Sequence, residues 1–409
     1  MSNIIGLLRF IYHYVLAWAG SFWYKHPSRK IFVIGVTGTK GKSSVLEMVN
    51  AILEAAGKKT ALISSVRVKI DAESRQNLTG MTMPGRFFIQ RFLAEAVKRG
   101  CDYALVEVTS QGVLQHRHRF IDFNAALITN LESEHIEAHG SFENYRNAKL
   151  KFFTYVAKQS RKKSKFFFVN IGMQNSELFA KAASGYGYYI PYSRKDMEKL
   201  KIKTKLIGVF NQENIAAAIA IARSRNIDWE TIKNALEDFD GVPGRLEFVQ
   251  KFPFSVIIDY AHTPDSLEKV YQTLKKKKVR SKQQKLICVL GSAGGGRDVW
   301  KRPVMGQIAA RYCDEIILTN EDPFDEDPQE IVNQIAHGIK NSAEPKKYKA
   351  IIDRKEAIKA AIKIAKHNDT VIITGKGCEP YMRIARGKKI RWDERELVSK
   401  ILSHEKIEI

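Results

Sequence analysis

The stretch Thr37-Gly-Thr-Lys-Gly-Lys-Ser-Ser44 decides the fold of this chain, because it joins the apolar run Ile31–Val36 to a helical pattern that begins at Ser43. A strand, a glycine-rich turn and a helix in this order are typical of phosphate-binding loops, in which backbone N–H groups and the helix N-terminus face the phosphate. The spacing departs from GxxxxGK[ST], since Val36 stands five residues before Gly41, and it fits a shorter G-T-x-G-K-[ST] variant. The loop therefore predicts an ATP site whose ligands are Gly38, Thr39, Lys40, Gly41, Lys42, Ser43 and Ser44.

Short β-branched runs alternate with helical patterns on both sides of this loop. The strand candidates are Ile31–Val36, Thr60–Val66, Tyr103–Val108, Ala125–Thr129, Val256–Asp259, Leu286–Leu290, Ile316–Thr319 and Val371–Thr374. The first helix candidates are Ser43–Ala56 and Phe87–Arg99, each closed by a glycine. Continuous apolar strands that alternate with helices predict α/β domains with parallel sheets. We expect a P-loop-type central sheet domain and a Rossmann-like C-terminal α/β domain.

The turn-rich segment Gly241-Val-Pro-Gly244 separates two such blocks. We place the domain boundary at this segment. The expected organisation is a hydrophobic N-terminal helix within residues 1–29, an ATP-binding domain at 30–242 and a C-terminal domain at 243–409. A chain of 409 residues is long enough for each block to bury its own core.

The composition is that of a globular protein with a strong positive charge. The 44% hydrophobic and 27% charged content excludes a disordered chain, and the net charge of +23 favours anionic partners in general. No basic motif with interleaved aromatic residues accompanies this charge, so no nucleic-acid partner is expected. The four cysteines have no CxxC spacing, and those in or beside apolar segments (Cys101, Cys288 and Cys313) predict buried free thiols in a reducing compartment.

The N-terminal segment Ile4–Tyr24 has 21 residues and a single formal charge, Arg9. As a helix it would be about 31 Å long. Arg9 near its centre and the many Tyr, Trp and His residues argue against a membrane-spanning helix, and the segment lacks a signal-peptide cleavage site. Two interpretations stay open: an interfacial helix at the inner membrane face, followed by Lys25, Arg29 and Lys30, or a helix packed on protein.

Carboxylates follow two of the predicted strands. Glu107 stands near the carboxyl end of its strand, where open α/β sheets bind ligands, and its hard oxygen suits Mg²⁺. The segment Thr129–Gly140, TNLESEHIEAHG, follows the next strand and is dense in His and Glu. Together with the phosphate loop, these residues predict metal-assisted chemistry on ATP.

The loop and these segments resemble the Mur ligase family, from about Ile31 to Glu394, and the later motifs resemble its UDP-N-acetylmuramoyl-tripeptide synthetase branch. The resemblance implies a cytoplasmic, ADP-forming ligase of peptidoglycan synthesis that joins an amino acid to a muramoyl peptide through an acyl phosphate. It also implies ATP and Mg²⁺ as cofactors, and a muramoyl peptide and an amino acid as substrates.

The resemblance assigns the catalytic and metal-binding residues. Thr129–Gly140 is similar to the family's TNL-x-x-DHLDYHG segment and implies His135 as a ligand of a second metal. Tyr145-Arg-Asn-Ala-Lys149 is similar to Y-x-x-A-K, whose lysine is carbamylated, so that the ammonium is replaced by metal-binding oxygens. The implied catalytic set is therefore Lys42, Glu107, His135 and Lys149, and the implied metal ligands are Ser43, Glu107, His135 and the carbamate of Lys149.

Substrate residues follow from the same resemblance. The implied acyl-substrate residues are Thr82, Met83, Thr109, Gln115 and Arg117, with Met83 and Thr109 replacing the family's Thr and Ser. Asn214 of the G-x-x-N-x-x-N segment, Arg245 of P-G-R, and Asp259 and His262 of D-Y-A-H-T-P are implied on the ATP side.

The residues implied to bind the amine substrate contain the most informative difference between this sequence and the family's motifs. Members that add diaminopimelate carry D-N-P-R, whose Arg can hold a second carboxylate, whereas this chain has Glu321-Asp-Pro-Phe324. Phe324 argues against diaminopimelate, and Asp322 favours a cationic side chain. The full set of implied amine-side residues is Arg297, Glu321, Asp322, Pro323, Phe324, Gly375 and Glu379.

About thirty residues precede the first strand, which is too few for the uridine-binding domain usual in this branch. This departure keeps three alternatives open: a γ-glutamyl-like ligase acting on a different or membrane-linked carboxylate, a non-catalytic ATP-binding partner subunit, and a nucleic-acid binder supported by charge alone. The retained Gln115 and Arg117 favour the muramoyl-peptide ligase.

Overall fold

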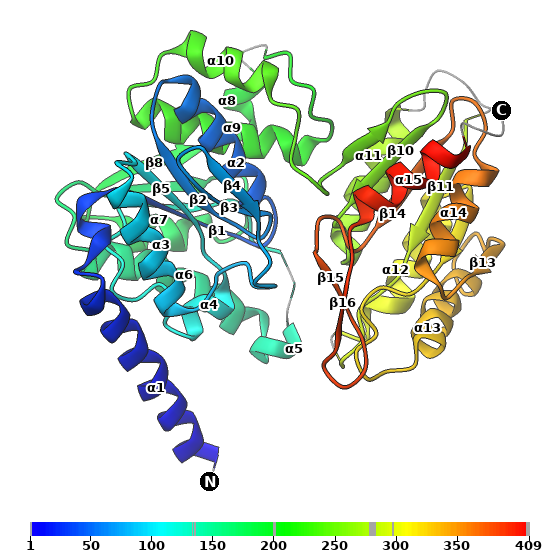
Figure 1. Ribbon diagram of the computed structural model, residues 1–409, viewed down its shortest axis with the longest axis horizontal. Coiled ribbons are helices and arrows are strands. Elements are labelled where there is room, and N and C mark those ends of the chain that lie inside the picture. Colours follow the sequence, from blue (N-terminus) through cyan, green and yellow to red (C-terminus); the bar gives the residue numbers. More distant parts are fainter. Residues whose placement is uncertain are drawn as a thin grey trace. The chain divides into compact units, whose positions relative to one another are not determined.

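The computed structural model describes residues 2–132, 134, 136–198, 202–277, 284–296 and 298–405, which form two compact units (Figure 1). The first unit ends at Asp240 and the second begins at Gly241.

The first unit is built on an eight-stranded sheet of order β4-β3-β2-β5-β1-β6-β7-β8. Neighbouring strands from β2 to β8 in this order run parallel, and β3 and β4 form an antiparallel edge. The strands are β1 (Phe32–Thr37), β2 (Thr60–Ile63), β3 (Arg67–Ile70), β4 (Glu73–Gln76), β5 (Tyr103–Glu107), β6 (Ala125–Ile128), β7 (Phe166–Asn170) and β8 (Tyr188–Tyr192).

Helices cover both faces of this sheet, because successive side chains of each strand point to opposite faces and both faces are apolar. Val33 and Val106 belong to the core formed with α3 and α6, whereas Ile34 and Leu105 belong to the core formed with α2 and α9. The helices of this unit are α1 (Ser2–Trp23), the 3₁₀ helix η1 (Pro27–Lys30), α2 (Lys42–Ala55), α3 (Arg86–Lys98), α4 (Ser110–Leu114), α5 (Ile136–His139), α6 (Phe142–Gln159), α7 (Ser176–Ala183), α8 (Arg194–Glu198), α9 (Val209–Ser224) and α10 (Trp229–Asp238).

The second unit contains a six-stranded sheet of order β13-β12-β11-β14-β10-β9 and a two-stranded sheet of β15 and β16. Only β9 of the larger sheet runs antiparallel to its neighbour. The strands are β9 (Glu247–Gln250), β10 (Ser255–Asp259), β11 (Leu286–Leu290), β12 (Glu315–Leu318), β13 (Tyr348–Ala350), β14 (Thr370–Thr374), β15 (Tyr381–Arg383) and β16 (Lys389–Arg391). The helices are α11 (Pro264–Lys277), α12 (Lys301–Tyr312), α13 (Pro328–Lys340), α14 (Arg354–Ile364) and α15 (Glu394–Glu405).

The predicted α/β class with two parallel-rich sheets is confirmed. The predicted strands and helices lie within a few residues of the observed ones, and β1, the phosphate loop and α2 follow one another as expected. The antiparallel strands β3 and β4 were not predicted, because β4 is exposed along its whole length and carries no apolar alternation.

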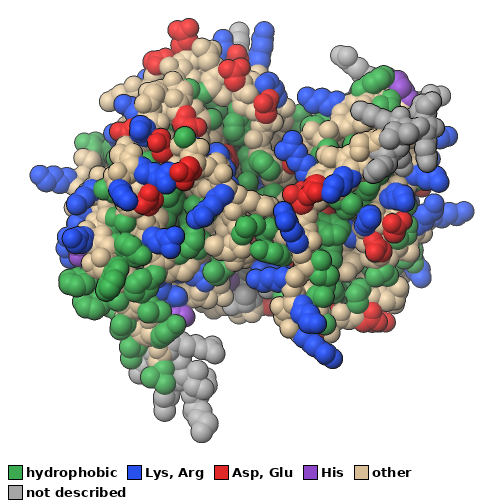
Figure 2. All heavy atoms as spheres, in the orientation of Figure 1, with side chains coloured by type: hydrophobic (Ala, Val, Ile, Leu, Met, Phe, Trp, Pro, Cys, Tyr) green, Lys and Arg blue, Asp and Glu red, His purple; other side chains and the backbone are tan. Residues whose placement is uncertain are grey.

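Helix α1 exposes much of its apolar surface. It packs on α3 near its C-terminal end, and Figure 1 shows its N-terminal half extending away from the rest of the first unit. Figure 2 shows hydrophobic side chains gathered at the base of this helix and over the part of it that is not drawn in grey. Within the part of the chain that the structure describes, no helix has the length and apolar character needed to cross a membrane.

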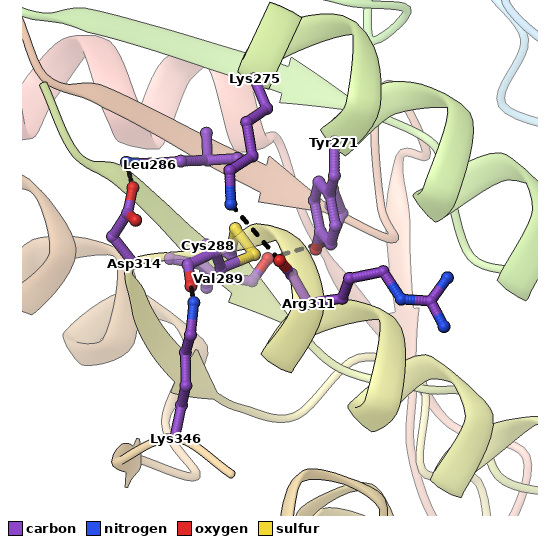
Figure 3. Close-up of a disulfide and its surroundings, with 10 residues drawn as sticks. Tyr271, Lys275, Leu286, Cys288, Val289, Arg311, Asp314 and Lys346 are labelled. Atoms are coloured by element: carbon purple, nitrogen blue, oxygen red, sulfur yellow. Dashed lines mark hydrogen bonds between the residues drawn. A yellow bond between two sulfur atoms is a disulfide. The ribbon is translucent and has the colours of Figure 1, made fainter. Parts of the chain in front are cut away.

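Two of the cysteines contradict the prediction of free thiols. Cys288 of β11 and Cys313, which lies between α12 and β12, form a disulfide with their Cα atoms 6.0 Å apart (Figure 3). The pair could not be predicted from the sequence, because the two cysteines are 25 residues apart and come close in space only when β11 pairs with β12. Cys101 is a buried free thiol, as predicted.

Candidate active site

The phosphate loop leaves the carboxyl end of β1 at the centre of the first sheet. Its conformation requires glycine at two positions. Gly38 has a φ of 142°, and a Cβ there would lie 1.9 Å from Oγ1 of Thr129; Gly41 has a φ of 80°, and its Cβ would lie 2.1 Å from Oδ1 of Asn214. Gly41 is also the N-cap of α2, where no side chain caps the helix. The loop thus presents a helix N-terminus of the kind that binds phosphate.

Two lysines converge on the backbone of this loop. Nζ of Lys42 donates to the carbonyl oxygens of Gly38 (3.1 Å) and Thr39 (3.0 Å), and Nζ of Lys149 donates to the same Gly38 oxygen at 2.7 Å. Lys42 also lies 3.9 Å from Oε1 of Glu107. The two predicted catalytic lysines therefore meet at one carbonyl group.

Glu107 ends β5 beside β1 and is almost fully buried. Its Oε2 accepts hydrogen bonds from Oγ of Ser43 (3.0 Å) and from the backbone N–H of Ser65 (2.9 Å). Ser43 also lies 2.9 Å from Oγ of Ser65. Hydroxyl and carboxylate oxygens are hard donors, so Ser43 and Glu107 fit a magnesium ion at the phosphate loop.

Lys149 lies on α6 and is only 1% exposed. Burial, and then the nearby Lys42 ammonium, lower the pKa of Lys149 well below its usual value, although Glu134 opposes the shift. Its Nζ lies 4.4 Å from the ring centroid of Tyr145, whose hydroxyl donates to Oγ1 of Thr39 at 3.1 Å. A lowered pKa increases the fraction of the neutral amine, which is the form of lysine that can react with carbon dioxide.

The segment after β6 packs on the phosphate loop. Oγ1 of Thr129 donates to the carbonyl of Lys40 (2.6 Å), and Oδ1 of Asn130 accepts the Lys40 N–H (2.9 Å). The Lys40 ammonium pairs with the buried carboxylate of Glu134 at 2.7 Å. The Lys40 side chain thus holds the loop against this segment, and its expected contact with ATP stays a prediction. The support from Thr129 and Asn130 was not predicted.

His135, the expected ligand of a second metal, lies outside the described residues. Across those residues, no group of three or more His, Cys, Asp and Glu could hold a metal ion. His139, which was not predicted, lies 3.1 Å from Oγ of Ser110 and contacts the ring of Tyr145 edge to face.

Four of the expected acyl-substrate residues lie at α4: Met83, Thr109, Gln115 and Arg117. Arg117 donates to Oε1 of Gln115 (2.6 Å) and to the carbonyl of Met83, and Oγ1 of Thr109 caps α4. Thr82 is the half-buried neighbour of Met83. Arg86 was not predicted.

Arg86 links this group to the N-terminal helix. Its guanidinium donates to the carbonyl of Gln115 at 2.8 and 3.0 Å and lies 2.5 Å from Nδ1 of His13 on α1.

Asn214 of α9 is buried against Gly41, and its amide donates to Oδ1 of Asn211 at 3.3 Å. The structure therefore places one residue from the expected ATP set directly at the loop.

In the second unit, Asp259 ends β10 and organises two loops. Its carboxylate accepts the N–H groups of Leu246 and Ala261, both at 2.7 Å. The guanidinium of Arg245 lies 4.2 Å from the ring centroid of Tyr260, and Nδ1 of His262 lies 2.7 Å from the Tyr260 carbonyl. The Asp259 carboxylate thus holds the segments that carry Arg245 and His262, and its expected contact with ATP stays a prediction.

The expected amine-side carboxylates form a network around Lys376, which was not predicted. Nζ of the buried Lys376 donates to Oδ1 of Asp322 (2.8 Å) and to Oε2 of Glu379 (2.7 Å). Burial raises the pKa of Glu379, but the Lys376 ammonium outweighs burial and holds it below its usual value. The charge of Asp322 is thus compensated within the protein, which removes the reason to expect a cationic substrate side chain there.

Glu321 is buried beside this network. A Cβ at Gly375, whose φ is 110°, would lie 2.4 Å from Oε2 of Glu321. Burial raises the pKa of Glu321 to about 7. Pro323 approaches the glycine loop, since a Cβ at Gly294 would lie 2.1 Å from its carbonyl oxygen. Arg297, expected on the amine side, lies outside the described residues.

Comparisons with known proteins agree with this architecture. The Mur ligase middle domain matches residues 36–222, and the Mur ligase glutamate ligase domain matches residues 244–377.

Two curated relatives are both described as UDP-N-acetylmuramoyl-L-alanyl-D-glutamate–2,6-diaminopimelate ligases. The relative from Syntrophomonas wolfei is 36% identical over 95% of this chain and 81% of its own length, and that from Aquifex aeolicus is 37% identical over 92% and 78%.

A solved structure of a ligase of the same description has a TM-score of 0.59 at 28% identity and covers 92% of this chain and 79% of its own. Mycobacterium tuberculosis folylpolyglutamate synthase, at 16% identity, shares the fold with a TM-score of 0.69 over 88% of this chain and 92% of its own. The chain therefore belongs to the Mur ligase family, whose members are ATP-dependent, ADP-forming amide ligases.

Proposed function

We propose that this chain joins an amino acid to the terminal carboxylate of a UDP-N-acetylmuramoyl peptide in peptidoglycan precursor synthesis. Two curated relatives carry ligase names of this kind. The observation that carries the proposal is the meeting of Lys42, Ser43, Glu107 and Lys149 at one phosphate loop.

The reaction begins at the loop, where Lys42 and the N-terminus of α2 bind the triphosphate of ATP. A carboxylate oxygen of the muramoyl peptide attacks the γ-phosphorus, the bond to ADP breaks, and an acyl phosphate forms. Mg²⁺, when bound, would screen the negative charge of the reacting groups, and Ser43 and Glu107 would hold it. The amine nitrogen then attacks the acyl carbon, phosphate leaves, and the amide forms with loss of a proton.

We propose that Lys149 acts as a carbamate. Its buried neutral amine attacks carbon dioxide, the N–C bond forms, and one proton goes to solvent. The resulting anion would replace the hydrogen bond to Gly38 with oxygens that suit a cation. ¹³C-bicarbonate labelling followed by NMR tests this step: a carbamate signal is expected in the wild type and in Lys151→Ala, an exposed neighbour on α6, but not in Lys149→Ala. An identical signal in all three proteins refutes the assignment.

An ADP-release assay tests the ligase itself. We expect ADP to form only when ATP, a UDP-muramoyl dipeptide and an amino acid are all present. Glu107→Gln should lower the rate at least about 100-fold, because it removes a proposed metal ligand, whereas Glu143→Gln at the exposed start of α6 should not. ADP formation that does not depend on the muramoyl peptide contradicts the proposal and points to a different carboxylate.

We also propose that the enzyme works in the cytoplasm at the inner face of the cell membrane, through α1. Phe22 and Trp23 are 64% and 75% exposed, and Trp18 is 50% exposed. Residues 1–30 contain four Lys and Arg and no acidic residue. An apolar, aromatic helix with basic flanks suits the surface of an anionic bilayer.

Flotation with phosphatidylglycerol vesicles tests this location. The triple variant Trp18→Ser, Phe22→Ser, Trp23→Ser should lose vesicle binding, whereas Trp229→Ser, which changes an exposed tryptophan on α10, should retain it. Equal flotation of the two variants rules out a role for α1 at the membrane.

A further inference from the structure

An open pocket lies at the amino end of the first sheet, where its parallel strands begin. It has a volume of about 500 Å³, and its walls include the first residues of β1, β7 and β8, which are Phe32, Phe166 and Tyr188. The phosphate loop follows the other end of β1, whose six residues separate the two places by roughly 17 Å. The pocket is therefore distinct from the proposed ATP site.

The guanidinium of Arg225 lies over two of these rings. Arg225 follows α9, and its Cζ lies 4.4 Å from the ring centroid of Phe32 and 5.2 Å from that of Phe166. Phe166 in turn stacks on Tyr188, with the ring centroids 5.1 Å apart. Attraction between a cation and aromatic faces fixes the position of the guanidinium, but it supplies no oxygen acceptor for the N–H groups.

The side chain of Arg225 has no oxygen acceptor within the described part of the chain. Its Nε is buried without a hydrogen-bond partner, and none of its other side-chain N–H groups donates to a described residue. No Asp or Glu is among the described residues that line the pocket. Arg223, two residues earlier, differs because its guanidinium donates to the carbonyl of Ile227 at 3.0 Å. A charged donor without an acceptor is costly, so a purely structural role does not account for Arg225.

Two further polar side chains line the pocket and suit an anion. Lys163 is exposed, and it belongs to the segment 158–165, which contains five Lys and Arg and no acidic residue. Oδ1 of Asn124 accepts the N–H of Val33 at 3.0 Å, so the NH₂ end of this amide remains for the pocket. Guanidinium, ammonium and amide groups are all donors, and a phosphate oxygen accepts from each of them.

The segment 158–165 also reaches the base of α1. Helix η1 joins α1 to β1, and Nζ of Lys162 donates to the carbonyl oxygens of Arg29 (3.1 Å) and Ile31 (2.8 Å). The pocket and the base of α1 thus lie at the same end of the first sheet. A phosphate bound by Lys163 would lie on the side of this unit that carries the helix proposed to contact the membrane.

We propose that this pocket is a second phosphate site, which binds the phosphate group of a phosphate ester through Arg225 and Lys163. A planar guanidinium can hold phosphate oxygens with paired hydrogen bonds, and the ring of Tyr188, which is 62% exposed, covers the organic part of the ester. Two sources share this chemistry: the headgroup of an anionic phospholipid and a soluble phosphate ester. The inference goes beyond the ligase activity and does not depend on it.

NMR of arginine ¹⁵Nε–H groups detects binding at this pocket rather than at the phosphate loop. The Arg225 signal is the one absent from Arg225→Gln, and the Arg223 signal is the one absent from Arg223→Gln. Protein saturated with ADP and Mg²⁺ is titrated with glycerol 3-phosphate and with glycerophosphoglycerol, the headgroup of phosphatidylglycerol without its acyl chains. The Arg225 signal should shift and the Arg223 signal should not. Lys163→Gln should raise the dissociation constant roughly 10-fold, as expected for one lost charge-assisted hydrogen bond.

Flotation with phosphatidylglycerol vesicles distinguishes the two sources. If the lipid headgroup is the ligand, Arg225→Gln should weaken vesicle binding roughly 10-fold. Arg223→Gln is the matched control, because it removes the same charge from an exposed side chain of the same helix and should float as the wild type. If a soluble ester is the ligand, both variants should float as the wild type although the Arg225 signal shifts. Urea denaturation verifies that each variant folds.

The combined outcomes decide whether the site exists. A loss of flotation confined to Arg225→Gln supports the lipid headgroup, and a selective shift of the Arg225 signal with unchanged flotation supports the soluble ester. If the Arg225 signal shifts no more than that of Arg223, and the two variants float equally, the pocket binds no phosphate and the inference is overturned. The ADP-release assay is independent of this result, so the ligase proposal stands or fails by itself.

Discussion

Replacement of Gly41 by alanine tests whether the shape of the phosphate loop determines ATP binding. Gly41 has a φ of 80°, and a Cβ there would lie 2.1 Å from Oδ1 of the buried Asn214. Gly57 is a matched control, because it has a φ of 71°, follows the other end of α2, and has no atom within 4 Å of an added Cβ. Comparison of Gly41→Ala with Gly57→Ala therefore distinguishes the effect of backbone strain, which both variants share, from the steric conflict with Asn214, which only Gly41→Ala has.

The expected magnitudes follow from these two environments. A left-handed conformation costs an L-residue roughly 1–2 kcal/mol, so Gly57→Ala should lower the free energy of unfolding by about that amount and leave activity unchanged. Gly41→Ala carries the same strain and must also move Asn214 or the loop by about 1 Å to restore normal contact. A displacement of this size at a reacting centre can lower kcat/KM for ATP roughly 100-fold.

The assay measures ADP formation against ATP concentration, with urea denaturation of both variants alongside. Gly41→Ala should raise KM for ATP or lower kcat, whereas Gly57→Ala should do neither. If both variants have the wild-type kcat/KM for ATP, the loop does not hold the triphosphate in this conformation.

Three further predictions concern stability and covalent structure. Arg354→Met should lower the free energy of unfolding by about 3–5 kcal/mol, because it leaves the buried Glu394 carboxylate unpaired. Lys400→Met, which breaks an exposed pair with Glu396, should leave the free energy of unfolding nearly unchanged, and similar losses in the two variants would refute the distinction. Burial raises the pKa of Glu321 from 4.5 to about 7. Between pH 4.5 and 7 the native state therefore binds more protons than the unfolded state. The contribution of Glu321 to the free energy of unfolding consequently falls as the pH rises through this range. The urea midpoint of Glu321→Gln should therefore fall less between pH 5 and 8 than the midpoint of the wild type. If the two midpoints change equally with pH, the raised pKa of Glu321 is contradicted. Thiol titration in denaturant without reductant should detect two thiols, Cys101 and Cys378, whereas four would exclude the disulfide.

The sequence was sufficient for the central part of the fold because its signals are local. Ile31–Val36 is continuously apolar, the glycines and Lys42 follow in register, and the next apolar pattern has helical spacing. Glu107 was placed correctly at the phosphate loop because parallel strands end at the same edge of a sheet.

Contacts between distant segments could not be predicted in this way. Thr129 against Gly38, Asn214 against Gly41 and the Cys288–Cys313 disulfide each join residues whose proximity depends on strand order and helix packing. The ion pair of Asp322 with Lys376 was not predicted for the same reason, since the two residues lie 54 positions apart in the sequence.

An isotope-transfer experiment tests the proposed chemistry most directly. The terminal carboxylate of the muramoyl peptide is labelled with ¹⁸O, the ligase reaction is run with ATP and the amino acid, and the released phosphate is examined by ³¹P NMR. Attack of the carboxylate on the γ-phosphorus predicts one labelled oxygen in each phosphate released. Unlabelled phosphate, formed together with amide, would contradict an acyl phosphate and with it the proposed mechanism.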